Sequence, residues 1–327
     1  MNILMVCEQV LPAHLYGGTE RVVWSLTKAL TRLGHQVRLM SAAGSSCDFA
    51  PLLVYDPQRP LAAQIPPDTD VVHLHFDPRE TFAVPSVMTL HGNIADGQPT
   101  RANTIFISHN QAARHGGGAV VHNGLDWSDY TRFNPSQTRH YFHFLGKAAW
   151  KVKNVRGAID TVLRTPTEKL HVLGGHRLNF KMGFRFTVSP RIVFHGMVGG
   201  REKDALLNGS KGLVFPVTWH EPFGLALIES LYFGCPIFGT PYGSLPEVVT
   251  PEVGVLSNSC QTLSDSIMQQ HFLPQRCHEY ARDCFNAEVM ARAYLKHYEQ
   301  AINGETLTPV TPPNPTPVPT RNLPWTA

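Results

Sequence analysis

The stretch Trp219–Pro236, WHEPFGLALIESLYFGCP, decides the expected fold of this 327-residue chain. The run before it, Gly212–Val217, is short and apolar and is bounded by Gly and Pro, which predicts a buried strand. Leu225–Phe233 has helical spacing, and Gly234 and Pro236 are typical of a helix stop. The segment therefore predicts a strand, a tight loop and a helix, whose first backbone N–H groups would face whatever lies above the sheet.

The start of this helix is a candidate anion site with a carboxylate on each side. Gly224 has no side chain, so a phosphate could approach the backbone of residues 223–225 closely. Glu221 precedes the helix and could accept hydroxyls of a sugar, while Glu229 lies about a turn and a half inside it and could hold a ribose diol. A nucleotide-diphosphate sugar has this order of groups. The two glutamates alone are equally well explained as an acidic first turn and an ordinary surface residue.

Glu221, Glu229 and the segment Gly234–Ile237 resemble the donor-site signature of retaining glycosyltransferases of the GT-B architecture. The resemblance is to glycosyltransferase family 4, also called glycosyl transferases group 1, and it extends through most of residues 2–300. It implies that Glu221 contacts the transferred sugar, that Glu229 holds the ribose, and that the intervening backbone amides hold the diphosphate.

Composition agrees with a globular chain of two domains. The sequence is 43% hydrophobic and 16% charged, and its net charge of +3 is too weak to indicate nucleic acid as a partner. The 6 cysteines form no C-x-x-C pair, which favours reduced thiols in a cytoplasmic protein. Met1–Cys7 has no basic leader, and no apolar run is long enough to span a bilayer. We expect a cytoplasmic protein and leave open peripheral contact with the inner face of the membrane.

The beginning of the chain predicts a doubly wound α/β domain, from a strand at 3–6, a helix at 20–33 and a strand at 35–40. The dinucleotide motif G-x-G-x-x-G is absent, and no acidic residue ends the second strand, so a dinucleotide enzyme is disfavoured. The resemblance implies that Gly17 and Gly18 reach towards the donor phosphate and the acceptor. A plain strand-to-helix turn is the alternative.

Three histidines follow in two further strands. His73 and His75 share one face of a strand, and because no third metal ligand is evident we expect packed or hydrogen-bonded side chains. His91 lies at the carboxyl end of the next strand, where open parallel sheets bind ligands. The resemblance places His91 against the sugar and the acceptor. A further strand is expected at 119–126.

The second half of the chain is expected to supply cations for the leaving diphosphate. Lys147 stands where the family usually has Arg, and Lys still carries the charge but lacks the bidentate fork. Lys153 precedes Asn154 as the family's Lys does, so it is favoured over Lys151. Cleavage of the sugar–phosphate bond builds negative charge that these cations would stabilise. Exposed lysines without a role are the alternative. The strand expected at 191–198 carries His195 near the nucleotide base.

The expected fold class is α/β, a GT-B arrangement of two Rossmann-like, doubly wound parallel-sheet domains facing a cleft. Residues 1–134 would form the acceptor domain and residues 135–302 the donor domain, with a last helix at about 287–302 crossing back onto the first domain. Residues 303–327 are rich in proline and predict an extended or disordered tail.

The resemblance implies a retaining, metal-independent transferase of the hexosyltransferase type, active in glycan, glycolipid or cell-envelope polysaccharide synthesis. It would need no cofactor and would move a sugar from a UDP- or GDP-sugar to a hydroxyl acceptor such as a glycan, a glycolipid or a small molecule. The expected catalytic residues are His91, Lys147, Lys153 and Glu221. The expected donor-binding residues are Gly17, Gly18, Lys147, Lys153, His195, Glu221, Phe223, Gly224, Leu225 and Glu229.

Three other functions fit the same architecture. A sugar-nucleotide epimerase would need acid and base residues around the sugar, which the sequence does not identify. A phosphorylase would accept inorganic phosphate in place of the hydroxyl. A catalytically degenerate binding subunit is favoured by Lys147 and by the short first domain.

Overall fold

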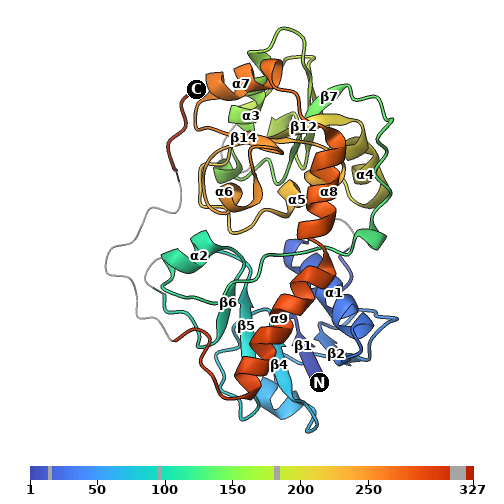
Figure 1. Cartoon of the computed structure of the whole chain (residues 1–327), viewed down its shortest axis with the longest axis vertical. Helices are drawn as coiled ribbons and strands as arrows, with labels where there is room; N and C mark the ends of the chain where they lie inside the picture. The colour runs from blue at the N-terminus through green and yellow to red at the C-terminus, as the bar shows by residue number, and fades with distance from the viewer. Residues whose placement is uncertain (14–16, 95–97, 180–184, 310–321) are drawn as a thin grey trace. The chain divides into compact units, whose positions relative to one another are not determined.

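The computed structural model describes residues 1–13, 17–94, 98–179, 185–309 and 322–327. The chain forms two compact units, coloured from blue to red along the sequence in Figure 1. The first unit contains Met1–Trp127 and Phe285–Val318, and the second contains Ser128–Cys284 and Pro319–Ala327. The chain thus leaves the first unit at Trp127, before the expected boundary at residue 134, and returns to it at Phe285.

The first unit is built on a six-stranded parallel sheet with the order β3-β2-β1-β4-β5-β6. This is the doubly wound order, in which the chain reverses direction across the sheet beside β1. Parallel strands are covered on both faces, which explains why β1 and β4 are almost continuously apolar. The strands are β1 Asn2–Val6, β2 Gln36–Ser41, β3 Leu52–Val54, β4 Val71–Leu74, β5 Ser86–Leu90 and β6 Thr104–Phe106.

Helices α1 and α9 cover this sheet and pack against each other. Helix α1 buries Val22, Val23 and Leu26 on one face. Helix α9 lies along β4 and β5, as Figure 1 shows, and its buried residues Tyr294 and Tyr298 reach polar groups of those strands. The helices of this unit are α1 Gly18–Arg32, α2 His109–Arg114 and α9 Ala287–Ile302, with the 3-10 turn η1 Leu61–Gln64 and η2 Trp127–Asp129 where the unit ends.

The strand expected at 119–126 is wrong. Only isolated bridges form here, from Val120 to Phe106 and from Leu125 to Asn286. Gly124 passes so close to the returning chain that an added Cβ would lie 2.2 Å from the carbonyl oxygen of Asn286. The apolar pattern of this segment therefore reflects burial against distant chain and not membership of the sheet.

The second unit repeats the same architecture. Its six-stranded parallel sheet has the order β11-β8-β7-β12-β13-β14, so β7 takes the place that β1 has in the first unit. A small antiparallel pair, β9 with β10, is added after β8. The strands are β7 Tyr141–Leu145, β8 Leu170–Leu173, β9 Leu178–Asn179, β10 Arg185–Phe186, β11 Ile192–Phe194, β12 Ser210–Phe215, β13 Ile237–Gly239 and β14 Gly254–Leu256.

Helix α5 follows β12 and is the helix that the opening stretch of sequence predicts. It packs against α8 and against β12 and β13, so Leu227, Ile228 and Leu231 are all buried. A helix that is buried on nearly every side, as α5 is, is expected to be mostly apolar. The helices of this unit are α3 Val155–Leu163, α4 Gly200–Asn208, α5 Leu225–Tyr232, α6 Leu245–Val248, α7 Cys260–Gln269 and α8 Pro274–Cys284, with the 3-10 turn η3 Lys151–Lys153.

The described ends of the proline-rich tail are ordered by backbone hydrogen bonds. Near its start, the carbonyl of Thr308 accepts from Asn103 N, within the first unit. At its end, Leu323 N donates to Thr218 O, and Thr326 pairs with Ser259 in the second unit. Residues 310–321 of the expected tail lie outside the described residues. Among the described helices, none combines the length and the apolar character that crossing a bilayer would require.

Candidate functional site

Glu221, in the loop between β12 and α5, forms a buried ion pair with Lys153 of the 3-10 turn η3. The Lys153 ammonium lies 2.8 and 2.6 Å from the two carboxylate oxygens of Glu221. The indole of Trp219 donates a third hydrogen bond to the same carboxylate at 2.6 Å, and Lys153 also lies 5.0 Å from that indole's ring centroid. Glu221 and Lys153 are only 5% and 7% exposed. Lys151, by contrast, is exposed.

The loop that carries Glu221 is held by the turn between β13 and α6. Gly243 has φ +65°, and a Cβ there would lie 2.2 Å from the backbone nitrogen of Glu221. Ser244 N donates to the carbonyl of Glu221 at 3.0 Å, and its hydroxyl donates to the carbonyl of Phe223 at 2.6 Å. On the other side, Asn154 Nδ2 donates to Pro216 O. Hydrogen bonds to its own backbone carbonyls thus fix the loop on both sides.

Helix α5 begins at Leu225, directly after a glycine in the left-handed conformation. Gly224 has φ 81° and ψ 73°, which favours glycine, and among the described residues no side chain caps the helix there. Phe223 is buried beneath the loop. The positive end of the helix dipole therefore lies, without a side-chain cap, at the loop that carries Glu221.

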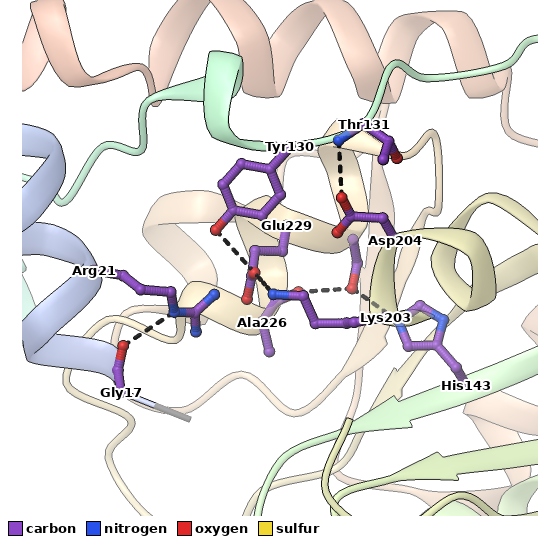
Figure 2. Close-up of polar contacts among 10 residues, drawn as sticks. Gly17, Arg21, Tyr130, Thr131, His143, Lys203, Asp204, Ala226 and Glu229 are labelled. Carbon is purple, nitrogen blue, oxygen red and sulfur yellow. Dashed lines mark hydrogen bonds and ion pairs between the residues drawn. The ribbon is translucent and has the colours of Figure 1, made fainter. Parts of the chain in front are cut away.

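Glu229 is not an ordinary surface residue, because it is 1% exposed and lies in a polar cluster (Figure 2). The hydroxyl of Tyr130 donates to Glu229 Oε1 at 3.0 Å, and the Lys203 ammonium forms an ion pair with the same oxygen. Lys203 lies on α4, also buried, with its ammonium 5.2 Å from the ring centroid of Tyr130. The next residue on α4, Asp204, accepts from Thr131 N at 2.8 Å, and burial raises its pKa.

Sequence reasoning missed Lys203 and Tyr130. The available signal is that Lys203 lies one helical turn before the buried Leu207, so it occupies the inward face of α4. A charged residue at an inward position needs a partner of opposite charge. The sequence does not indicate that this partner is Glu229.

Lys147 and His195 follow two strands of the second unit at their carboxyl ends. Lys147 comes after β7, and its ammonium lies 5.1 Å from the ring centroid of Trp150. His195 comes after β11, is half-buried, and shares a hydrogen bond of 3.1 Å with His171. Burial lowers the pKa of both imidazoles, that of His171 to about 4. Both are therefore neutral at pH 7.

The remaining expected residues lie in the first unit. Gly17 caps α1, and its carbonyl accepts from the Arg21 guanidinium at 3.0 Å (Figure 2). A Cβ at Gly17 would lie 2.8 Å from Ala13 Cβ, so space alone requires glycine there, and Gly18 is the first residue of the helix. His91 follows β5, and its Nε2 lies 2.8 Å from His75 Nδ1. Burial lowers the pKa of His91 to about 4.

Residues 133–283 match the family model described as Glycosyl transferases group 1. The matched range contains Lys153, Glu221 and Glu229, together with almost the whole second unit. The second unit is therefore similar to glycosyl transferases group 1 along almost its whole length. None of the curated proteins matches the sequence significantly.

Several solved structures share the fold over nearly the full chain. AviGT4, a glycosyltransferase involved in avilamycin A biosynthesis, is similar with a TM-score of 0.76 at 20% identity, covering 93% of this chain and 99% of that one. Sucrose-phosphate synthase from Thermosynechococcus elongatus has a TM-score of 0.69 at 16% identity, covering 93% and 100%. HepE from Anabaena, in complex with UDP-glucose, has a TM-score of 0.64 at 15% identity, covering 92% and 100%. The expected fold class, α/β with two Rossmann-like parallel sheets of the GT-B type, is confirmed.

Proposed function

We propose that this protein is a retaining hexosyltransferase that moves a sugar from a nucleotide-diphosphate sugar to a hydroxyl acceptor, without a metal or a further cofactor. The observation that carries the proposal is the arrangement around α5. A helix start without a side-chain cap lies between two buried carboxylates, each already oriented by a lysine and an aromatic donor.

The diphosphate of the donor would lie on the first N–H groups of α5, at Phe223, Gly224 and Leu225. Lys147 and Lys153 would add the positive charge that stabilises the departing phosphate, which is the largest electrostatic demand of the reaction. A carboxylate has about four lone-pair sites. Glu221 uses three of them for Lys153 and Trp219, which leaves room for a sugar hydroxyl.

Glu229 would hold the ribose. Two donors, Tyr130 and Lys203, converge on its Oε1, so the carboxylate is turned into one orientation before any ligand arrives. Such preorganisation reduces the entropy lost on binding. His195 would lie near the base, and HepE, described in complex with UDP and with UDP-glucose, makes UDP-glucose the first donor to test.

The first unit would supply the acceptor side. His91 would contact the sugar and the acceptor, and Gly17 and Gly18 would approach the donor phosphate. Because no carboxylate is assigned as nucleophile, the departing phosphate would itself take the proton of the acceptor hydroxyl on the face it leaves. Positioning and electrostatics would then supply most of the rate enhancement.

The test is a screen of UDP- and GDP-sugars by thermal shift, followed by turnover with the donor that binds. We expect one donor class to raise Tm and Glu229→Gln to weaken its binding about tenfold or more, the equivalent of about 1.4 kcal/mol. Glu168→Gln is the matched control, because Glu168 also pairs with a lysine, Lys211, in the same unit but at the amino ends of β8 and β12, away from the start of α5.

Each part of the proposal has its own readout. The anomeric configuration of the product reports retention, and unchanged turnover in EDTA reports independence of metal. Donor binding without transfer to any hydroxyl acceptor would instead favour a binding subunit, and release of a sugar phosphate would favour a phosphorylase. If no nucleotide sugar binds, or if Glu229→Gln binds like Glu168→Gln, the proposed site is wrong.

A further inference from the structure

The first unit contains a row of three imidazoles, of which His73 and His75 are buried and His91 is half-buried. The proposed function does not explain the two buried ones. His73 lies in β4, His75 directly follows it, and His91 directly follows the neighbouring strand β5. The rings of His73 and His75 are tilted by 34° with centroids 4.2 Å apart, and those of His75 and His91 are stacked with centroids 5.1 Å apart. The last histidine of the row is His91, which is the residue expected to contact the sugar.

Both ring nitrogens of His73 have hydrogen-bond partners. Its Nδ1 lies 2.6 Å from the hydroxyl of Tyr298, and its Nε2 lies 2.7 Å from the hydroxyl of Thr89. Thr89 in turn lies 2.8 Å from the hydroxyl of Tyr294. These four side chains tie α9 to β4 and β5, and they fix the orientation of the His73 ring that His75 contacts.

Only one ring nitrogen of His75 has a hydrogen-bond partner among the described residues. Its Nδ1 lies 2.8 Å from His91 Nε2, whereas its Nε2 is buried and has no hydrogen-bond partner among the described residues. Burial lowers the pKa of all three histidines, so each is a neutral imidazole with one N–H and one lone pair. One proton therefore lies between His75 and His91, and it belongs to one ring or to the other.

The two arrangements differ in what they leave unpaired. If His91 donated, the proton of His75 would stand on Nε2 as a buried N–H without an acceptor. If His75 donates, Nε2 is left only with a lone pair. Buried N–H groups without an acceptor are rarer in proteins than acceptors that lack a donor. The geometry therefore favours His75 as the donor.

We propose that His75 is a positioning residue that donates its Nδ1 proton to His91 Nε2 and so fixes His91 in the tautomer with its proton on Nδ1. The described residues form no hydrogen bond to His91 Nδ1, so this N–H is left for a ligand. His91 then acts as a hydrogen-bond donor to an oxygen of the sugar or the acceptor, and not as a base. The role of His91 rests on the proposed function, whereas its tautomer does not.

The direct test is ¹⁵N NMR of the full chain labelled in its histidine rings, since protonated and unprotonated ring nitrogens have distinct shifts. We expect the His91 proton on Nδ1 in the unmodified protein. His75→Phe keeps an aromatic ring but removes the donor, so His91 should then populate both tautomers. His75→Asn places an amide N–H near the former Nδ1 and should restore the single tautomer.

Turnover supplies the second readout. His75→Phe should lower kcat/KM about tenfold or more, because a small misorientation of a group that contacts the substrate is costly, and His75→Asn should recover most of it. The control is His73→Phe, which removes two buried hydrogen bonds without touching the bond between His75 and His91. It should lower Tm and leave the tautomer of His91 unchanged.

A proton on His91 Nε2 in the unmodified protein would overturn the proposal, whether or not the variants fold. In a protein that does transfer sugar, equal kcat/KM values of His75→Phe and His75→Asn would also overturn it. The expected tautomer in a protein that transfers no sugar from any nucleotide would support the assignment to His75 and would overturn the proposed function.

Discussion

Lys153 and Glu221 show how a single pair of residues determines the character of the candidate site. Both side chains lose almost all their water, and the loss is balanced by a bidentate contact and by the Trp219 indole. An apolar pair of similar volume is often as stable as a buried ion pair, so stability does not require these charges. Under the proposed function both charges would serve the donor, the lysine at its diphosphate and the carboxylate at its sugar.

Removing one partner alone should be costly. Lys153→Met leaves the Glu221 carboxylate buried without its cation, and we expect the free energy of unfolding to fall by about 3–5 kcal/mol in urea titrations. The double variant Lys153→Met/Glu221→Leu should regain most of that stability while donor turnover stays lost. Lys211→Met is the control, because its more exposed pair with Glu168 is worth only about 0–1 kcal/mol. A Lys153→Met protein as stable as the control would contradict the role of the buried pair.

Helix α5 contributes to the stability of the second unit through its buried residues and to the candidate site through its first turn. Its apolar residues are enclosed by the sheet and α8, and its polar residue Glu229 reaches a second cluster on α4. The loop from Pro216 to Gly224, which leads into the helix, is in close contact with the backbone of a neighbouring turn. The neighbouring Gly243–Ser244 turn fixes that path by contacting Glu221 and Phe223 directly.

The turn at Gly243 provides a test at the scale of the element. Gly243→Ala introduces a Cβ 2.2–2.3 Å from backbone atoms of Glu221 and also strains a φ of +65°. We expect a loss in unfolding free energy clearly larger than the roughly 1–3 kcal/mol that an unfavourable φ alone costs, together with weaker donor binding. Gly304→Ala is the matched control, because Gly304 has φ +79° with nothing within 4 Å of the added Cβ. An equal loss of unfolding free energy in the two variants would show that the close contact with Glu221 does not contribute to stability.

At the scale of the whole molecule, both units are built alike and both bury neutral histidines. The two sheets share one strand order, with β1 and β7 in equivalent places. In the first unit burial lowers the pKa of His91 to about 4, and in the second it lowers that of His143 to about 3. His143 is held between the hydroxyls of Ser210 and Ser230 at 2.7 and 2.8 Å.

These histidines predict a loss of stability in weak acid. Between the ordinary pKa of about 6.5 and the lowered value, the unfolded chain binds a proton that the folded chain does not, so stability falls as pH falls. The window extends from about pH 6.5 to about pH 4 for His91 and to about pH 3 for His143. Each imidazole contributes up to about 1.4 kcal/mol per pH unit there. Urea titrations at pH 7, 6, 5 and 4 should show the slope, and His143→Asn should reduce it. Unchanged stability across this range would contradict neutral burial.

The sequence by itself determined the local elements and, through them, the fold class. Apolar runs predicted β1 and, displaced by two residues, β12. Helical spacing with a glycine stop predicted α1 and α5, because such patterns depend on neighbours within a few turns of chain. It also singled out Glu221 and Glu229. The strand expected at 119–126 failed because the same apolar pattern arises from burial against Phe285 and Asn286, far along the chain.

Only the tertiary structure decided which groups meet. Lys153 and Glu221 are 68 residues apart, Tyr130 and Glu229 are 99 apart, and His75 and His91 are 16 apart on neighbouring strands. A hydrogen bond depends on positions within a fraction of an ångström, and these positions are set by the packing of whole elements and not by local sequence. The sequence thus supplied the charged and polar groups, whereas the fold chose their partners, and the partners determine what each group can do.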